Sequence, residues 1–254
     1  MGHVRIGRLP KRWGWEDVIA ALSSQGESDK TLIAATARAA SRTLLAAQHQ
    51  ESIALAYWTF VDLAAASRTA TFLERVPQTR EHLTGLSLIK LISGRLEQEI
   101  RSRAGCTALD EIALETFNTV ILGTVRDASQ TLFGCTVETV QSSLRELSTK
   151  SGVAWVGRRF FSEYAYRALR FALEKELARS LRQGRFRTSG DLSRFDERLK
   201  TYCSDVSRIV EDYSGGWYSK AVWEKRLTLE EARHFTGYAI EKLLSELSTE
   251  RSSA

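Results

Sequence analysis

The sequence predicts an all-α protein, a single multi-helix domain of about nine or ten helices with a short extended N-terminal arm. Apolar residues recur at three-and-four spacing through most of the 254 residues, which is the period of a helix with one buried face. Pro10 and Pro77 are the two prolines, and Ala and Leu are abundant, so long uninterrupted helices are favoured. Hydrophobic residues at 43% and charged residues at 26% are typical of a chain that folds.

We expect three parts along the chain. Residues 1–14 form a basic extended arm, in which Val4 and Ile6 alternate with Arg5. Residues 15–248 form the helical domain, and residues 249–254 form a frayed C-terminus. No repeat of 20 to 50 residues is found, so a solenoid of the familiar consensus types is not expected.

In the first part of the domain, caps and breakers set the expected helix boundaries. Ser28 or Asp29 can cap the second helix. Pro77 interrupts the chain after the third helix, and Gly105 and Gly134 lie where helix C-caps are expected. The expected helices are 15–22, about 29–48, 51–74, 80–103, 109–132 and 136–148.

In the second part, one segment without interior glycine or proline predicts a helix about 45 Å long, enough to cross the whole domain. The pair Gly215 and Gly216 predicts a mobile turn. Thr228 followed by Glu231 is a capping box and predicts the start of the last helix. The expected helices are 153–183, 191–213, 217–226 and 228–247.

Cysteine and histidine positions argue against a metal site or a disulfide framework. Cys106, Cys135 and Cys203 are odd in number and widely spaced, so they are expected as reduced, buried small hydrophobes in a cytosolic protein. Glu231 and His234 form one Glu-x-x-His, whereas a di-iron bundle needs two copies and two further glutamates. We therefore expect no metal and no cofactor.

Enzymatic and membrane functions also lack their usual signals. GxxxxGK[ST], GxGxxG, GxSxG and HExxH do not occur, so we expect no enzyme. The longest apolar stretch, residues 52–61, is about half the ~20 residues of a bilayer-spanning helix, and no apolar region follows the basic N-terminus. Arg makes up 27 of the 36 basic residues, which is typical of GC-rich bacterial genomes. We expect a bacterial cytoplasmic protein.

Charge is distributed unevenly. Residues 1–15 carry a net charge of +4 and residues 157–187 carry +6, which leaves −5 over the rest of the chain. After Glu176 the acidic residues stop, so the arginines that follow are expected to be uncompensated, in a glycine-loosened loop where Phe186 could stack a base. The residues predicted to bind a nucleic acid or an acidic partner are Arg5, Arg8, Lys11, Arg12, Arg179, Arg182, Arg185 and Arg187. An ordinary solvated surface is the alternative for these arginines.

Trp217 and Tyr218 are predicted as a docking patch for a protein, because they flank the expected double-glycine turn. The alternative is that their rings fold back onto the core.

The first functional hypothesis is a non-catalytic subunit or adaptor that binds another protein in a larger assembly. The second is a sequence-nonspecific DNA-binding or RNA-binding protein, as in a multi-gene defence or mobile-element system. The third is an enzyme with a site between helices.

Overall fold

The computed structural model describes residues 15–24, 28–69, 72, 84–129, 135–180, 185–186 and 188–249. Within these ranges the chain is all-helical in one compact arrangement, and an isolated bridge pairs Thr84 with Thr136. The predicted all-α multi-helix fold class is confirmed, whereas the predicted N-terminal arm, residues 1–14, lies outside the described residues. The described helices are α1 (Trp15–Ser23), α2 (Asp29–Leu44), α3 (Ala47–Ala66), α4 (Gly85–Arg103), α5 (Ala108–Ser129), α6 (Val137–Leu147), α7 (Lys150–Ser180), α8 (Ser189–Val206), α9 (Arg208–Trp223) and α10 (Leu229–Ser248).

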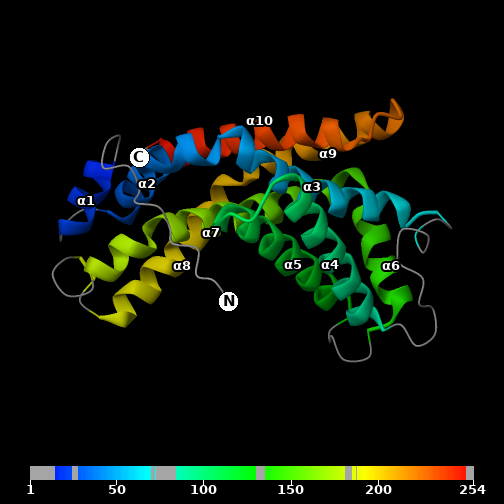
Figure 1. Ribbon diagram of the computed structural model, residues 1–254, viewed down its shortest axis with the longest axis horizontal. Coiled ribbons are helices and arrows are strands. Elements are labelled where there is room, and N and C mark those ends of the chain that lie inside the picture. The colour runs from blue at the N-terminus through cyan, green and yellow to red at the C-terminus, as the bar shows by residue number, and fades with distance from the viewer. Residues whose placement is uncertain are drawn as a thin grey trace.

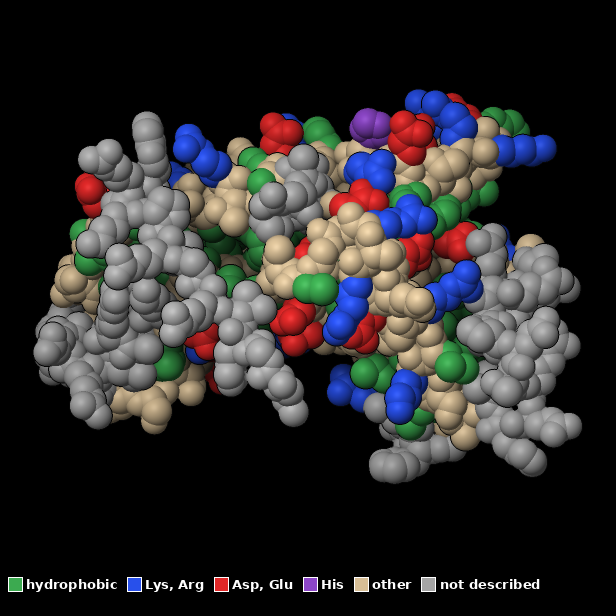
Figure 2. Space-filling model, viewed as in Figure 1, with side chains coloured by type: hydrophobic (Ala, Val, Ile, Leu, Met, Phe, Trp, Pro, Cys, Tyr) green, Lys and Arg blue, Asp and Glu red, His purple; other side chains and the backbone are tan. Residues whose placement is uncertain are grey.

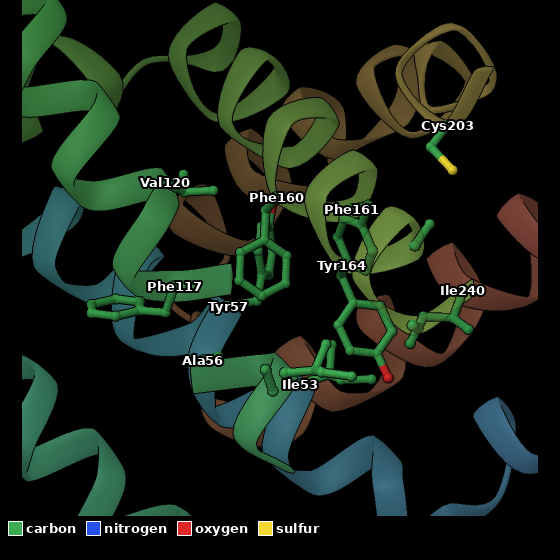
Figure 3. Close-up of a cluster of buried hydrophobic side chains, with 14 of the residues drawn as sticks. Ile53, Ala56, Tyr57, Phe117, Val120, Phe160, Phe161, Tyr164, Cys203 and Ile240 are labelled. Carbon is green, nitrogen blue, oxygen red and sulfur yellow. The ribbon is translucent and has the colours of Figure 1, made fainter. Parts of the chain in front are cut away.

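The long helix α7 is the centre of the fold, as its predicted length requires. It packs against α1, α2, α5, α6, α8 and α9, so apolar residues are needed around most of its circumference. Phe160 and Phe161 are fully buried and both rings lie 5.3 Å from the ring of Tyr57 on α3 (Figure 3). Three helices thereby share one aromatic core, because Phe235 of α10 also stacks on Tyr57 at 5.3 Å.

The helices form an arch in which α10 runs along the top (Figure 1). Below α10, helices α1 and α8 lie on one side of the arch, and helices α4, α5 and α6 lie on the other side. α10 closes the fold over α2 and α3: Arg38 donates to the carbonyl of Ser248 at 3.0 Å, and Arg233 pairs with Glu51 at 2.7 Å. α7 joins the two sides of the arch.

One predicted boundary is wrong. The chain breaks at Ser207, between α8 and α9, and Gly215 and Gly216 lie inside α9 rather than in a turn. The physical reason is close packing, since a Cβ at Gly215 would lie 2.3 Å from the carbonyl oxygen of Lys150 on α7. Gly215 is therefore a contact point between helices and not a breaker.

Helix caps follow the sequence. Ser28 caps α2 through a bond from the amide of Thr31, and Thr228 caps α10 by accepting from the amide of Glu231 at 3.3 Å. The reciprocal capping box is formed at the start of α8, by Thr188 and Asp191. None of the described helices combines the length and apolar character needed to cross a bilayer.

Candidate anion-binding groove

A groove of ≈ 710 Å³ lies between α5, α7 and α8. α5 and α8 both pack against α7, which forms the floor, and their side chains form the two walls. Its size falls within the range of about 300 to 1,000 Å³ that is usual for ligand sites. The groove is lined by Thr119, Val120, Leu122, Gly123, Arg126, Trp155, Arg158, Arg159, Ser162, Glu163, Lys200 and Ser204.

The floor is one polar face of an otherwise buried helix. Trp155, Arg159 and Ser162 follow one another at helical spacing along α7, with Arg158 and Glu163 beside them. The opposite side of the same turns carries the buried aromatic rings that pack on α3. Because the backbone of α7 is held from that side, the polar face is presented on a rigid support.

Arg159 is fixed by three contacts. Its guanidinium donates to the carboxylate of Asp127 on α5 at 2.8 Å. It lies 4.9 Å from the centre of the Trp155 ring, an arrangement in which the cation is attracted to the face of the ring. On the α5 side it passes Gly123, where a Cβ would lie 2.7 Å from Nη2. The absence of a side chain at position 123 leaves room for the guanidinium.

The other cations of the groove come from all three helices. Arg158 bridges to the α8 and α9 segment, donating to the carbonyl of Ser204 at 3.2 Å and to Glu211 at 3.1 Å. Arg126 lies on the α5 wall, 63% exposed, with its guanidinium 3.6 Å from Asp127. Lys200 lies on the α8 wall, with its ammonium 5.7 Å from the centre of the Tyr166 ring. Arg126 and Lys200 are thus held more loosely than the two arginines of the floor.

The charge of the lining is positive. Among the described lining residues four side chains are basic and one, Glu163, is a carboxylate, which is turned toward Arg167 at 2.7 Å. Asp127 and Glu211, next to the lining, pair with Arg159 and Arg158 and leave Arg126 and Lys200 to give the groove its excess positive charge. At the rim, the hydrogen bond from Arg159 and the charges of Arg159 and Arg126 lower the pKa of Asp127. With Thr119, Ser162 and Ser204 as further donors, the groove can bind an anion that also offers a flat apolar group to Trp155.

Most of the basic residues predicted from the sequence to bind an anionic partner cannot be compared with the groove, because they lie outside the described residues. Arg5, Arg8, Lys11, Arg12, Arg182 and Arg187 are outside the described residues. Arg179 is part of α7, and its side chain is outside the described part of the chain.

The expectation that Arg185 is uncompensated is wrong. Its side chain is 11% exposed and forms an ion pair with Asp29 at the start of α2. Its backbone amide donates to the carbonyl of Leu22 at 3.0 Å, which ties this segment to α1. Phe186, expected as an exposed stacking ring, is buried and packs 5.2 Å from Phe195 of α8. The local sequence lacks acids, but the fold supplies one from a distant helix.

Trp217 and Tyr218 do not flank a turn. Trp217 stacks on Phe235 of α10 with the ring centres 4.4 Å apart, and Tyr218 is buried with its hydroxyl 3.4 Å from the carbonyl of Ser148. The predicted exposed patch fails here because α9 continues through both residues. The exposed tryptophan of this helix is Trp223, at its last turn, with 87% of its surface accessible.

The Glu-x-x-His pair of the sequence, Glu231 and His234, lies on the surface of α10. Glu231 lies 3.5 Å from Arg226, and His234 is exposed on α10. Among the described residues no group of His, Cys, Asp and Glu is arranged to hold a metal ion. On the face shown in Figure 2, Lys and Arg side chains alternate with Asp and Glu side chains and form no continuous basic stripe.

Comparison of the chain with protein-family models, curated proteins and solved structures finds no match. The groove is therefore interpreted from its own geometry.

Sequence reasoning missed the groove, although part of its signal is local. Trp155 and Arg159 are four residues apart, the spacing at which a cation can lie over a ring on a helix. Thr119 with Gly123, and Lys200 with Ser204, repeat that spacing on the two walls. Only the three-dimensional arrangement brings these three pairs together.

Proposed function

We propose that this protein is a non-catalytic nucleic-acid-binding protein that holds its ligand in the groove between α5, α7 and α8. The observation that supports the proposal most strongly is the lining itself, in which four basic side chains and an exposed tryptophan face a recess of ≈ 710 Å³. Positive grooves that contain aromatic rings are typical of proteins that bind nucleic acid without sequence preference.

The ion pairs of the groove floor favour binding, because they fix the arginines before a ligand arrives. Arg158 and Arg159 are each hydrogen-bonded to a carboxylate on a neighbouring helix, so little side-chain freedom is lost when a phosphate approaches. Arg126 and Lys200, which are held more loosely, can turn toward a phosphate from the walls of the groove. We propose a phosphate contact for each of these two side chains.

The proposal is tested by the salt dependence of binding to a single-stranded oligonucleotide. Each phosphate contact contributes a slope of roughly −0.7 in log affinity against log salt. The double variant Arg126→Gln with Lys200→Gln should therefore flatten the slope by about 1.4, if each side chain neutralises one phosphate. Arg101→Gln, on the outside of α4 and 64% exposed, is the matched control and should leave the slope unchanged. Absence of binding, or equal slopes in the two variants, would contradict the proposal.

A protein adaptor is the second candidate function, and Trp223 favours it. This ring is 87% exposed at the end of α9, next to Val222 at 46%, and tryptophan is enriched at the centres of protein interfaces. If the adaptor function holds, Trp223→Ala should remove a partner that co-purifies in stoichiometric amount, whereas Trp155→Ala should retain it. As part of this second candidate function, we also propose that the protein is cytoplasmic and is a subunit of a bacterial protein assembly.

A further inference from the structure

The groove contains basic side chains and one partly exposed aromatic ring, that of Trp155. This combination favours single-stranded over double-stranded nucleic acid. Trp155 is 39% exposed although its helix is the centre of the core, and one face of its indole is covered by the guanidinium of Arg159. An electron-rich ring held by a cation is a rigid platform for a second flat group. A nucleobase could stack on the exposed part of the Trp155 indole, in addition to the guanidinium of Arg159.

We propose that the ligand is single-stranded, with an unpaired base stacked on Trp155 and its phosphates held by Arg126 and Lys200; this inference rests on the proposed function. In a duplex each base is already stacked between its neighbours and offers only its edges in the grooves. A base can lie on an indole only after leaving the stack, and a single strand meets this condition without the cost of unpairing.

The shape of the site supports the same choice. Proteins that recognise duplex sequence place a projecting helix or ribbon in the major groove. Here the cations lie on the floor and walls of a recess between three helices, with Arg158 and Arg159 at the bottom. A flexible single strand can follow such a recess and lay one or two nucleotides along its floor, which a stiff duplex does less readily.

The polar groups of the lining indicate tolerance of sequence. Apart from the cations, the side-chain donors among the described lining residues are the hydroxyls of Thr119, Ser162 and Ser204 and the indole N–H of Trp155. In the described part of the chain, the lining holds no Asn or Gln to form the paired hydrogen bonds that identify adenine. Stacking with phosphate contacts accepts any base, because every base has a flat face.

The inference is tested with four ligands, measured on the full chain: oligothymidylate, the same strand with abasic sugars, a duplex of the same length, and a poly-glutamate peptide. The abasic strand should bind roughly 5-fold to 150-fold more weakly than oligothymidylate, the equivalent of about 1 to 3 kcal/mol for one stacked base. Trp155→Ala should reduce oligothymidylate affinity by a similar factor and leave abasic-strand affinity unchanged. Trp155→Phe should retain most of the affinity, and Trp223→Ala, which removes an exposed indole outside the groove, should retain all of it.

The possible failures are distinguishable. If abasic or duplex ligands bind as tightly as oligothymidylate and still depend on Arg126 and Lys200, the stacking inference is overturned and nucleic-acid binding by the groove stands. If no nucleic acid binds, both proposals fall. Binding of poly-glutamate alone that requires Trp155 would also overturn both, and would assign the groove to an acidic protein.

Discussion

The α-carbon of Gly215 on α9 lies against the carbonyl oxygen of Lys150 at the start of α7, so closely that a Cβ at position 215 would be 2.3 Å from that oxygen. The next residue, Gly216, faces open space, with nothing within 4 Å of a Cβ. Of these two adjacent glycines in one helix, close packing requires Gly215, whereas the surroundings of Gly216 leave room for a side chain. This contrast provides a matched pair of substitutions.

Gly215→Ala should destabilise the protein by about 1 to 3 kcal/mol, because α9 must move away from α7 to accommodate the methyl group. Gly216→Ala should stabilise it by about 0.5 to 1 kcal/mol, since alanine loses less backbone entropy in a helix. Urea denaturation of both variants measures the difference. Equal effects would show that the close approach of the two helices is not maintained in solution.

The ion pair between Arg185 and Asp29 should contribute to stability, because both side chains are largely shielded, at 11% and 15% exposure. Arg185→Met should cost about 1.5 to 3 kcal/mol, the range for a hydrogen bond to a charged group. Arg103→Met is the control, since its pair with Glu99 is 49% and 37% exposed and should be worth less than about 1 kcal/mol. If thermal denaturation gives the same loss for both, Arg185 is not shielded as described.

Gly123→Ala should weaken ligand binding in the groove without weakening the core. The added methyl would lie 2.7 Å from Nη2 of Arg159, so the guanidinium must shift from its position between Asp127 and Trp155. We expect oligothymidylate affinity to fall about 10-fold, roughly the loss of one charge-assisted hydrogen bond. Gly94→Ala in α4, where a Cβ meets nothing within 4 Å, should leave affinity unchanged. Unaltered binding by Gly123→Ala would show that the position of Arg159 does not matter.

Cys106 should be the one thiol that reacts in the folded protein. The expectation that all three cysteines are buried is wrong for Cys106, which is exposed, whereas Cys135 and Cys203 are buried. Burial raises the pKa of both buried thiols. The thiolate is the reactive form, so these two are protected both sterically and by their protonation. Titration with a thiol reagent should label Cys106 under native conditions and all three residues in denaturant. Labelling of native Cys106→Ser would disprove this.

Tyr166 should make stability dependent on alkaline pH. Burial, followed by the hydrogen bond to Asp196 at 2.7 Å, raises the pKa of the Tyr166 phenol to about 12 from its ordinary value of 10.0. Because the folded state favours the protonated phenol, this contribution is fully present below pH about 10 and is lost as pH rises through about 12. The stability advantage of the native protein over Tyr166→Phe should therefore shrink across that interval in urea denaturation. An advantage independent of pH would contradict the assignment.

The helices were predictable because their signals are local. The period of apolar residues and the caps at Ser28 and Thr228 place α2 and α10 within a few residues, and the absence of breakers predicts the length of α7. The break at Ser207 was missed because glycine was taken as a local signal. At Gly215 the packing of α9 on α7 outweighs the roughly 1 kcal/mol that glycine costs inside a helix.

The candidate site was mostly beyond the reach of the sequence, because it depends on contacts between distant segments. Arg185 finds its acid 156 residues away, so a count of nearby charges could not reveal the pair with Asp29. The pair Trp155 and Arg159 is visible in the sequence at helical spacing. That α5 and α8 lie on either side of this pair is a property of tertiary packing alone.

The closure of the arch by α10 has a consequence for how the chain is made. α2 and α3 leave the ribosome early, yet the helix that covers them is the last of the described elements. At a synthesis rate of about 5 to 20 residues per second, roughly 10 to 40 s separate the two events. Throughout that interval the apolar faces of the early helices are open to solvent and to other nascent chains. The faces of α2 and α3 that α10 covers are therefore closed only after the rest of the described helices have been made.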